Sequence, residues 1–99
     1  MRLSPTHVQA IKETVTSLVG QEANIVLFGS RADDSARGGD VDLLITVKQP
    51  PDNFAYTASL LAAKVERALE GRRVNVVLRT ADSPIQPIHE IALRTGVAL

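Results

Sequence analysis

Hydrophobic residues follow two kinds of spacing along this chain, and the two kinds alternate. In three segments the apolar residues recur every three or four positions, as on one face of a helix. The predicted helices span 5–19, 53–70 and 88–95. Short runs of β-branched and aliphatic residues separate them, as in strands that are buried on both faces. The predicted strands span 24–28, 40–47 and 73–78. This order predicts an α/β (α+β) domain, a small mixed twisted β-sheet flanked by helices.

Residues at the ends of these segments support their bounds. Ser4 followed by Pro5 is a favourable start for the first helix, and Gly20 ends it. Either Asp52 or Asn53 caps the second helix. Because that helix links two strands, we expect a parallel pair with a right-handed crossover, with strand 73–78 beside or near strand 40–47.

Within strand 73–78, alternation of side chains predicts two faces with different partners. Val74, Val76 and Leu78 should share one face, and Asn75 and Val77 the other. His7 and His89 fall on the predicted helices, and we expect both to be exposed. The tail 97–99 is apolar and follows Gly96, and it is predicted to lie outside any element.

Composition limits the class of protein. With 99 residues, 44% of them hydrophobic, the chain is expected to form one domain over residues 1–99. The formal charge of +0 argues against a nucleic-acid polymer as its main ligand, and no apolar run is long enough for a membrane span. The absence of cysteine fits a cytoplasmic location. A domain this small gains stability from a partner subunit.

The segment between the first two strands carries the candidate chemistry at its end. Asp40 and Asp42 are two residues apart in a strand, so their carboxylates should point to the same face, about 7 Å apart. Neighbouring carboxylates repel each other unless a cation neutralises them. Mg²⁺ binds through one or two carboxylates and fills its other positions with water and substrate phosphates.

The start of the same segment is suited to phosphate. Gly29 allows backbone N–H groups to approach a ligand closely, and the Ser30 hydroxyl can donate to a phosphate oxygen. Arg31 and Arg37 can offset phosphate charge. A helical turn within 29–39 is expected to direct further N–H groups toward the ligand.

These residues resemble a family signature. The runs Gly29-Ser30-Arg31-Ala32, Ala36-Arg37 and Asp40-Val41-Asp42-Leu43-Leu44 are similar to those of the minimal nucleotidyltransferases, small members of the DNA polymerase beta superfamily. Residues 87–99 resemble the closing helix and Gly-Val ending of that family. The resemblance implies a polymerase beta-like nucleotidyltransferase fold. It further implies a nucleoside triphosphate held by Gly29 and Ser30, and two Mg²⁺ ions held by Asp40 and Asp42.

One position departs from that family. Members of the family have a third carboxylate on the strand that follows the crossover helix, and the matching residue in this chain is Asn75. An amide is a weak metal ligand and cannot accept a proton from an attacking hydroxyl. The resemblance therefore implies nucleotide and metal binding, with impaired turnover.

Three functions follow as hypotheses. The resemblance implies transfer of AMP from ATP to a hydroxyl of a helical HEPN-type partner protein, with this chain as the antitoxin of a toxin-antitoxin pair. Alternatively, the chain has lost transfer because of Asn75 and acts as a nucleotide-binding or partner-binding module. The third hypothesis is a homo-oligomer that uses the fold only as a scaffold.

Overall fold

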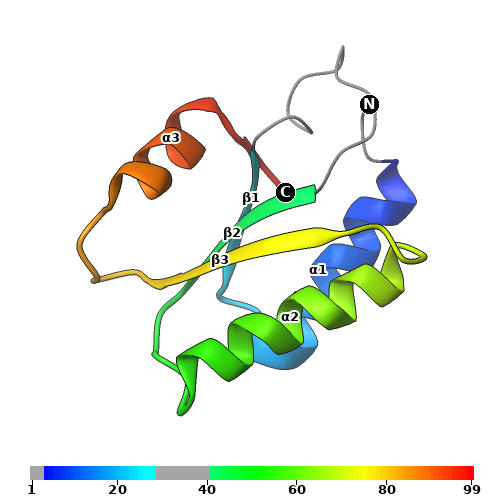
Figure 1. Ribbon diagram of the computed structural model, residues 1–99, viewed down its shortest axis with the longest axis horizontal. Helices are drawn as coiled ribbons and strands as arrows, with labels where there is room; N and C mark the ends of the chain where they lie inside the picture. Colours follow the sequence, from blue (N-terminus) through cyan, green and yellow to red (C-terminus); the bar gives the residue numbers. More distant parts are fainter. Residues whose placement is uncertain (1–3, 29–40) are drawn as a thin grey trace.

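A computed structural model describes residues 4–28 and 41–99 of the chain. In these ranges a mixed sheet lies between α1 and α2 on one face and α3 on the other (Figure 1). The elements are α1 (Pro5–Val19), β1 (Asn24–Phe28), β2 (Val41–Val47), α2 (Phe54–Ala68), β3 (Val74–Thr80), α3 (Pro87–Thr95) and β4 (Val97–Ala98). The predicted α/β fold class is confirmed.

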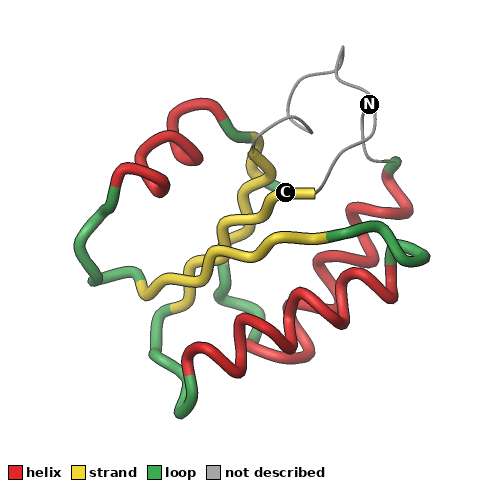
Figure 2. The backbone as a smooth tube through the Cα atoms, in the orientation of Figure 1, coloured by secondary structure: helices red, strands yellow, loops and turns green. Residues whose placement is uncertain are grey.

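The strands are arranged in the order β3-β2-β1-β4 (Figure 2). β1 runs antiparallel to both β2 and β4, whereas β2 and β3 are parallel. The prediction that strand 73–78 lies beside strand 40–47 is therefore confirmed. β3 continues two residues further than predicted, because Arg79 and Thr80 still pair with Thr46 and Val47 at the end of β2.

Side chains and backbone conformation set the helix ends. The Ser4 side chain accepts a hydrogen bond from the His7 N–H at 3.2 Å, and Asn53 caps α2 through a 3.0 Å bond from the Tyr56 N–H. α2 ends at Ala68, two residues before the predicted end, and Glu70 has a φ of 62°. That left-handed conformation cannot continue a right-handed helix.

The core is unevenly divided between the two faces of the sheet. The larger cluster lies against α1 and α2, and its fully buried members include Ile11, Val15, Leu43, Ile45, Leu61 and Val65. On the α3 face the buried cluster consists of Phe28, Leu44 and Ala92. The two faces of β3 match the prediction, since Val74, Val76 and Leu78 join the first cluster and Val77 the second. The α3 face is thus the less covered one.

The chain ends in a short strand where the sequence predicted only an apolar tail. Val97 and Ala98 pair with Leu27 and Val26, and the Leu99 N–H donates to the Ile25 carbonyl at 2.9 Å. Gly96 makes this turn possible, because a Cβ there would overlap the Ala92 carbonyl oxygen and the Val26 side chain. The reason for the difference is tertiary: β1 has a free edge to which the tail can add.

Of the helices in the described ranges, none is both long and apolar enough to cross a bilayer. α1 and α2 have 15 residues each, fewer than the roughly 20 that a membrane span needs.

Candidate functional site

Asp42 lies where three strands meet at one end of the sheet. It is the second residue of β2, and its Cα pairs with Phe28 at the end of β1 and with Asn75 near the start of β3. Its neighbours Val41 and Leu43 are fully buried against the α1 and α2 layer. Because side chains alternate along a strand, the half-buried Asp42 side chain lies on the α3 face.

Asn75 contacts Asp42 directly. Its Nδ2 donates a hydrogen bond to Oδ1 of Asp42 at 3.0 Å, across the parallel β2–β3 pair. Asn75 is exposed, so the pair is open to solvent on its outer side. Position 75, which is matched to the family's third carboxylate, therefore lies beside Asp42. The amide donates toward a carboxylate that would otherwise be available to a cation.

The other predicted site residues lie outside the described ranges. They are Gly29, Ser30, Arg31, Arg37 and Asp40. The structure does place the ends of the segment that contains them: Phe28 pairs with Asp42, and the Val41 N–H donates to the Arg73 carbonyl at 2.9 Å. The segment 29–40 thus leaves β1 and enters β2 at the end of the sheet that holds Asp42 and Asn75. The predicted roles of its residues stay predictions.

Comparison of the sequence with known protein families gives a match. Residues 8–97 match the family model described as a nucleotidyltransferase domain. The chain belongs to this family. No curated protein matches the chain. The match includes both described strands of the site and the segment that joins β1 to β2, so the nucleotidyltransferase domain extends over nearly the whole sequence.

The donor set of this nucleotidyltransferase domain fits a magnesium site in part. Nucleotidyltransferases use a nucleoside triphosphate and a divalent metal, and Mg²⁺ prefers carboxylate and carbonyl oxygens. Asp42 supplies a partly exposed carboxylate, and Asn75 an amide beside it. Within 4–28 and 41–99 no three His, Cys, Asp or Glu side chains converge on one point. The described residues therefore form no complete metal site, and Asp42 is a candidate ligand for one.

The prediction that His89 is exposed is wrong. His89 is 7% exposed, and its Nδ1 accepts a hydrogen bond from the Gln86 N–H at 3.1 Å, at the start of α3. His89 is buried because the first turn of α3 packs on the sheet. The sequence contained a usable signal, since position 89 is the third residue of a helix that begins at Pro87, where a side chain can reach back to the capping residue.

His7 also differs from its prediction. It is half-buried, and its Nδ1 is shielded from solvent with no hydrogen-bond partner among the described residues. It lies in the first turn of α1, on the opposite layer from the Asp42 side chain.

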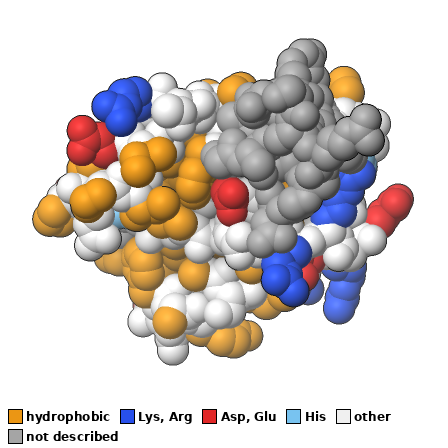
Figure 3. All heavy atoms as spheres, turned by 45° about the horizontal axis from the view of Figure 1, so that its top comes forward, with side chains coloured by type: hydrophobic (Ala, Val, Ile, Leu, Met, Phe, Trp, Pro, Cys, Tyr) orange, Lys and Arg blue, Asp and Glu red, His pale blue; other side chains and the backbone are white. Residues whose placement is uncertain are grey.

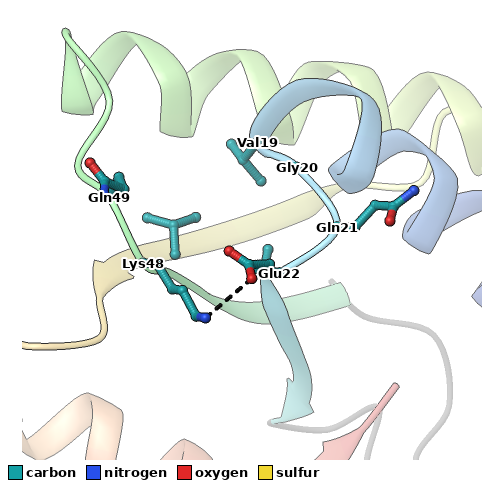
Figure 4. A pocket seen from close by; sticks show the side chains of 8 residues that line it. Val19, Gly20, Gln21, Glu22, Lys48 and Gln49 are labelled. Atoms are coloured by element: carbon teal, nitrogen blue, oxygen red, sulfur yellow. Dashed lines mark hydrogen bonds and ion pairs between the residues drawn. The ribbon is translucent and has the colours of Figure 1, made fainter.

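A hollow near the other end of β2 is separate from the candidate site. It lies between the end of α1 and the end of β2, with a volume of about 160 Å³ (Figure 4). An exposed ion pair between Lys48 Nζ and Glu22 Oε1, 3.2 Å long, spans it. Exposed pairs of this kind contribute little to stability. Val47 lines this hollow, five residues along β2 from Asp42, so the two features are separate.

Proposed function

We propose that this nucleotidyltransferase domain, residues 1–99, transfers AMP from ATP to a hydroxyl of a partner protein and requires Mg²⁺. One observation carries the proposal: Asp42 on β2 and position 75 on β3 are hydrogen-bonded neighbours at the sheet end where the segment 29–40 begins and ends. A transferase of this kind needs three groups at one edge of the sheet. They are its metal-binding carboxylates, its phosphate-binding turn and the residue at position 75 on the strand after the crossover helix.

One group of residues would bind the triphosphate, and another would bind the metal. Gly29 and Ser30 would hold the triphosphate, and Arg31 and Arg37 would offset its charge. Asp40 and Asp42 would hold Mg²⁺, which when bound neutralises the triphosphate and lowers the pKa of the acceptor hydroxyl.

The transfer itself replaces one bond to phosphorus by another. The acceptor oxygen would form a bond to the α-phosphorus of ATP while the bond from that phosphorus to the bridging oxygen of the β-phosphate breaks, and pyrophosphate leaves. The hydroxyl proton must go to water or to a base, because the Asn75 amide cannot accept it. A slow turnover is the expected consequence.

A second function is favoured by the same hydrogen bond. The Asn75 amide donates a hydrogen bond to Asp42, and an amide at this position offers a metal ion a weaker ligand than a carboxylate would. This supports a domain that has lost transfer and acts by binding nucleotide or a partner.

The partner is proposed from an apolar surface. We define the C-terminal apolar surface as the exposed large hydrophobic residues of the segment 85–97. They are Ile85, Ile88, Ile91, Leu93 and Val97. Figure 3 shows apolar side chains gathered on the α3 side of the molecule. A surface of this kind suits a helical protein, and we propose a HEPN-type toxin in the cytoplasm, with this chain as its antitoxin. A second copy of the chain is the alternative occupant.

The proposal is tested by incubating the purified chain with ATP, MgCl₂ and the protein encoded beside it. Intact-mass spectrometry should show the partner gaining the mass of one AMP, and Asp42→Asn should abolish that gain. Asp52→Asn is the matched control, since Asp52 is an exposed aspartate beyond the other end of β2. An unmodified partner would overturn the transferase proposal and leave the binding function. Equal labelling by Asp42→Asn would remove Asp42 from the site.

A further inference from the structure

Arg79 is a buried charge that pairs with no carboxylate of residues 4–28 and 41–99. It lies near the end of β3 and is 8% exposed. Its Nη2 donates to the Ser83 carbonyl at 2.9 Å, and its Nε is shielded from solvent and has no acceptor. Among the described residues, none forms an ion pair with its guanidinium. A buried charge is costly unless it is paired, and one neutral carbonyl satisfies only one of five N–H donors.

A cavity lies beside this arginine. It has a volume of about 390 Å³ and lies between the end of β3, the turn that follows it and the first turn of α3. The polar residues of its lining are Arg79, Thr80, Ser83, Gln86 and His89, and the apolar ones include Phe54 and Ile88. Volumes of roughly 300–1,000 Å³, with a few polar groups in an apolar wall, are typical of small-molecule sites.

Two further features favour a negative ligand here. α3 has nine residues and begins at Pro87, and the N-terminus of a helix carries partial positive charge. His89 Nδ1 accepts from the Gln86 N–H, so in the neutral ring the proton is on Nε2, which leaves one more donor in the lining. Glu90, the acidic residue of this turn, is exposed.

The cavity is separate from the proposed transferase site. Arg79 follows Asn75 by four residues on β3, which places their Cα atoms about 13 Å apart at roughly 3.3 Å per residue. Asn75 contacts Asp42, whereas Arg79 lines the cavity. A ligand here is therefore an additional one, and this inference does not depend on the transfer reaction.

We propose that this cavity binds the oxyanion group of a small molecule, a phosphate or a carboxylate, with Arg79 as its counter-charge. The guanidinium fork matches both groups in geometry and supplies a positive charge that no described carboxylate neutralises. The apolar wall formed by Phe54 and Ile88 suits the organic part of such a ligand.

The test is a ¹H–¹⁵N NMR titration of the whole chain with sodium phosphate and, separately, sodium acetate at constant ionic strength. The Arg79 Nε–H and the Ile88 and His89 amides should shift and saturate with either anion. A response to phosphate alone would show that the cavity binds phosphorylated ligands. A response to acetate alone would show that it binds carboxylates. The absence of any saturable shift with both anions would overturn the proposal, whatever the variants do.

Two variants test whether Arg79 is the residue that binds the anion. Arg79→Gln keeps the hydrogen-bonding capacity and removes the charge, and it should weaken binding by about tenfold or more. Arg94→Gln is the control, since Arg94 is an exposed arginine in the last turn of α3, away from the cavity lining. A folded Arg79→Gln variant with wild-type affinity would also overturn the proposal.

Discussion

Asn75 and Asp42 are hydrogen-bonded across two parallel strands, with Nδ2 of the amide 3.0 Å from Oδ1 of the carboxylate. The bond occupies the edge where a nucleotidyltransferase is expected to bind metal. It therefore makes the identity of residue 75 decisive for both stability and chemistry. A carboxylate there would repel Asp42, whereas the amide stabilises it.

Asn75→Asp should make the stability of the domain depend on Mg²⁺. Like charges at directly paired strand positions are destabilising, by roughly 1 kcal/mol, and a bound cation removes the repulsion. Urea unfolding in the absence of metal should show that loss, and added MgCl₂ should recover it. On the transferase proposal, the variant should also transfer AMP faster than the wild type.

The control for that measurement is Asn75→Ala. It removes the same hydrogen bond without adding charge, so MgCl₂ should stabilise it less than it stabilises Asn75→Asp. If Mg²⁺ stabilises Asn75→Asp no more than Asn75→Ala, position 75 does not face a metal site.

Asp42→Ala distinguishes the transferase from the binding module. A transferase that neutralises its partner by modifying it should fail when Asp42 is removed, with labelling reduced by about 100-fold or more if it holds the metal. A binding module should still neutralise the partner. The measurement is growth of cells that express the partner with either variant, accompanied by the unfolding midpoint of the variant. Retained neutralisation with lost labelling would support the binding module.

The neighbouring positions of β2 and β3 could be predicted because they depend on local patterns. The apolar run of β2, the amphipathic helix that follows and the alternation of Val74, Asn75 and Val76 are all visible in the sequence. Together they imply a parallel pair, whereas the register that places Asn75 opposite Asp42 is seen only in the structure.

Other features could not be predicted because they depend on contacts between distant segments. β4 exists because β1 has a free edge, and two residues carry too little pattern to indicate a strand. His89 and Arg79 are both polar, and their burial follows from the packing of α3 on the sheet. The roles of Gly29, Ser30 and Asp40 depend on a segment outside the described residues.

Ile91→Lys should weaken partner binding and leave the domain folded. Ile91 is 49% exposed on α3, within the C-terminal apolar surface, so a lysine costs little in the isolated chain. In a complex it would place an unpaired charge in an apolar contact, and we expect affinity to fall by about tenfold or more. Calorimetric titration of the partner measures the change.

Tyr56→Lys is the matched control for that surface. Tyr56 is 63% exposed and lies in the first turn of α2, outside the C-terminal apolar surface. The proposed interface predicts wild-type affinity for this variant. If both substitutions weaken binding equally, or if neither does, the partner does not dock on segment 85–97.

Gly96→Ala should release β4 from the sheet. A Cβ at this position would overlap the Ala92 carbonyl oxygen and the Val26 side chain, and both belong to packed elements that cannot move independently. We expect a loss of about 1–3 kcal/mol in unfolding free energy, as for other overpacked sites. Hydrogen exchange at the Leu99 N–H, which bonds to the Ile25 carbonyl, should accelerate most.

Gly71→Ala separates this packing effect from the loss of a glycine as such. Gly71 has a φ of 90° and open space around its Cβ position, so its substitution costs backbone strain alone. The Leu99 N–H should then keep its wild-type exchange rate, because Gly71 lies in the turn after α2 and not beside β4. If the Leu99 N–H also keeps its wild-type exchange rate in Gly96→Ala, the tail tolerates the added methyl group. In that case β4 does not depend on the close approach of Gly96 to Val26.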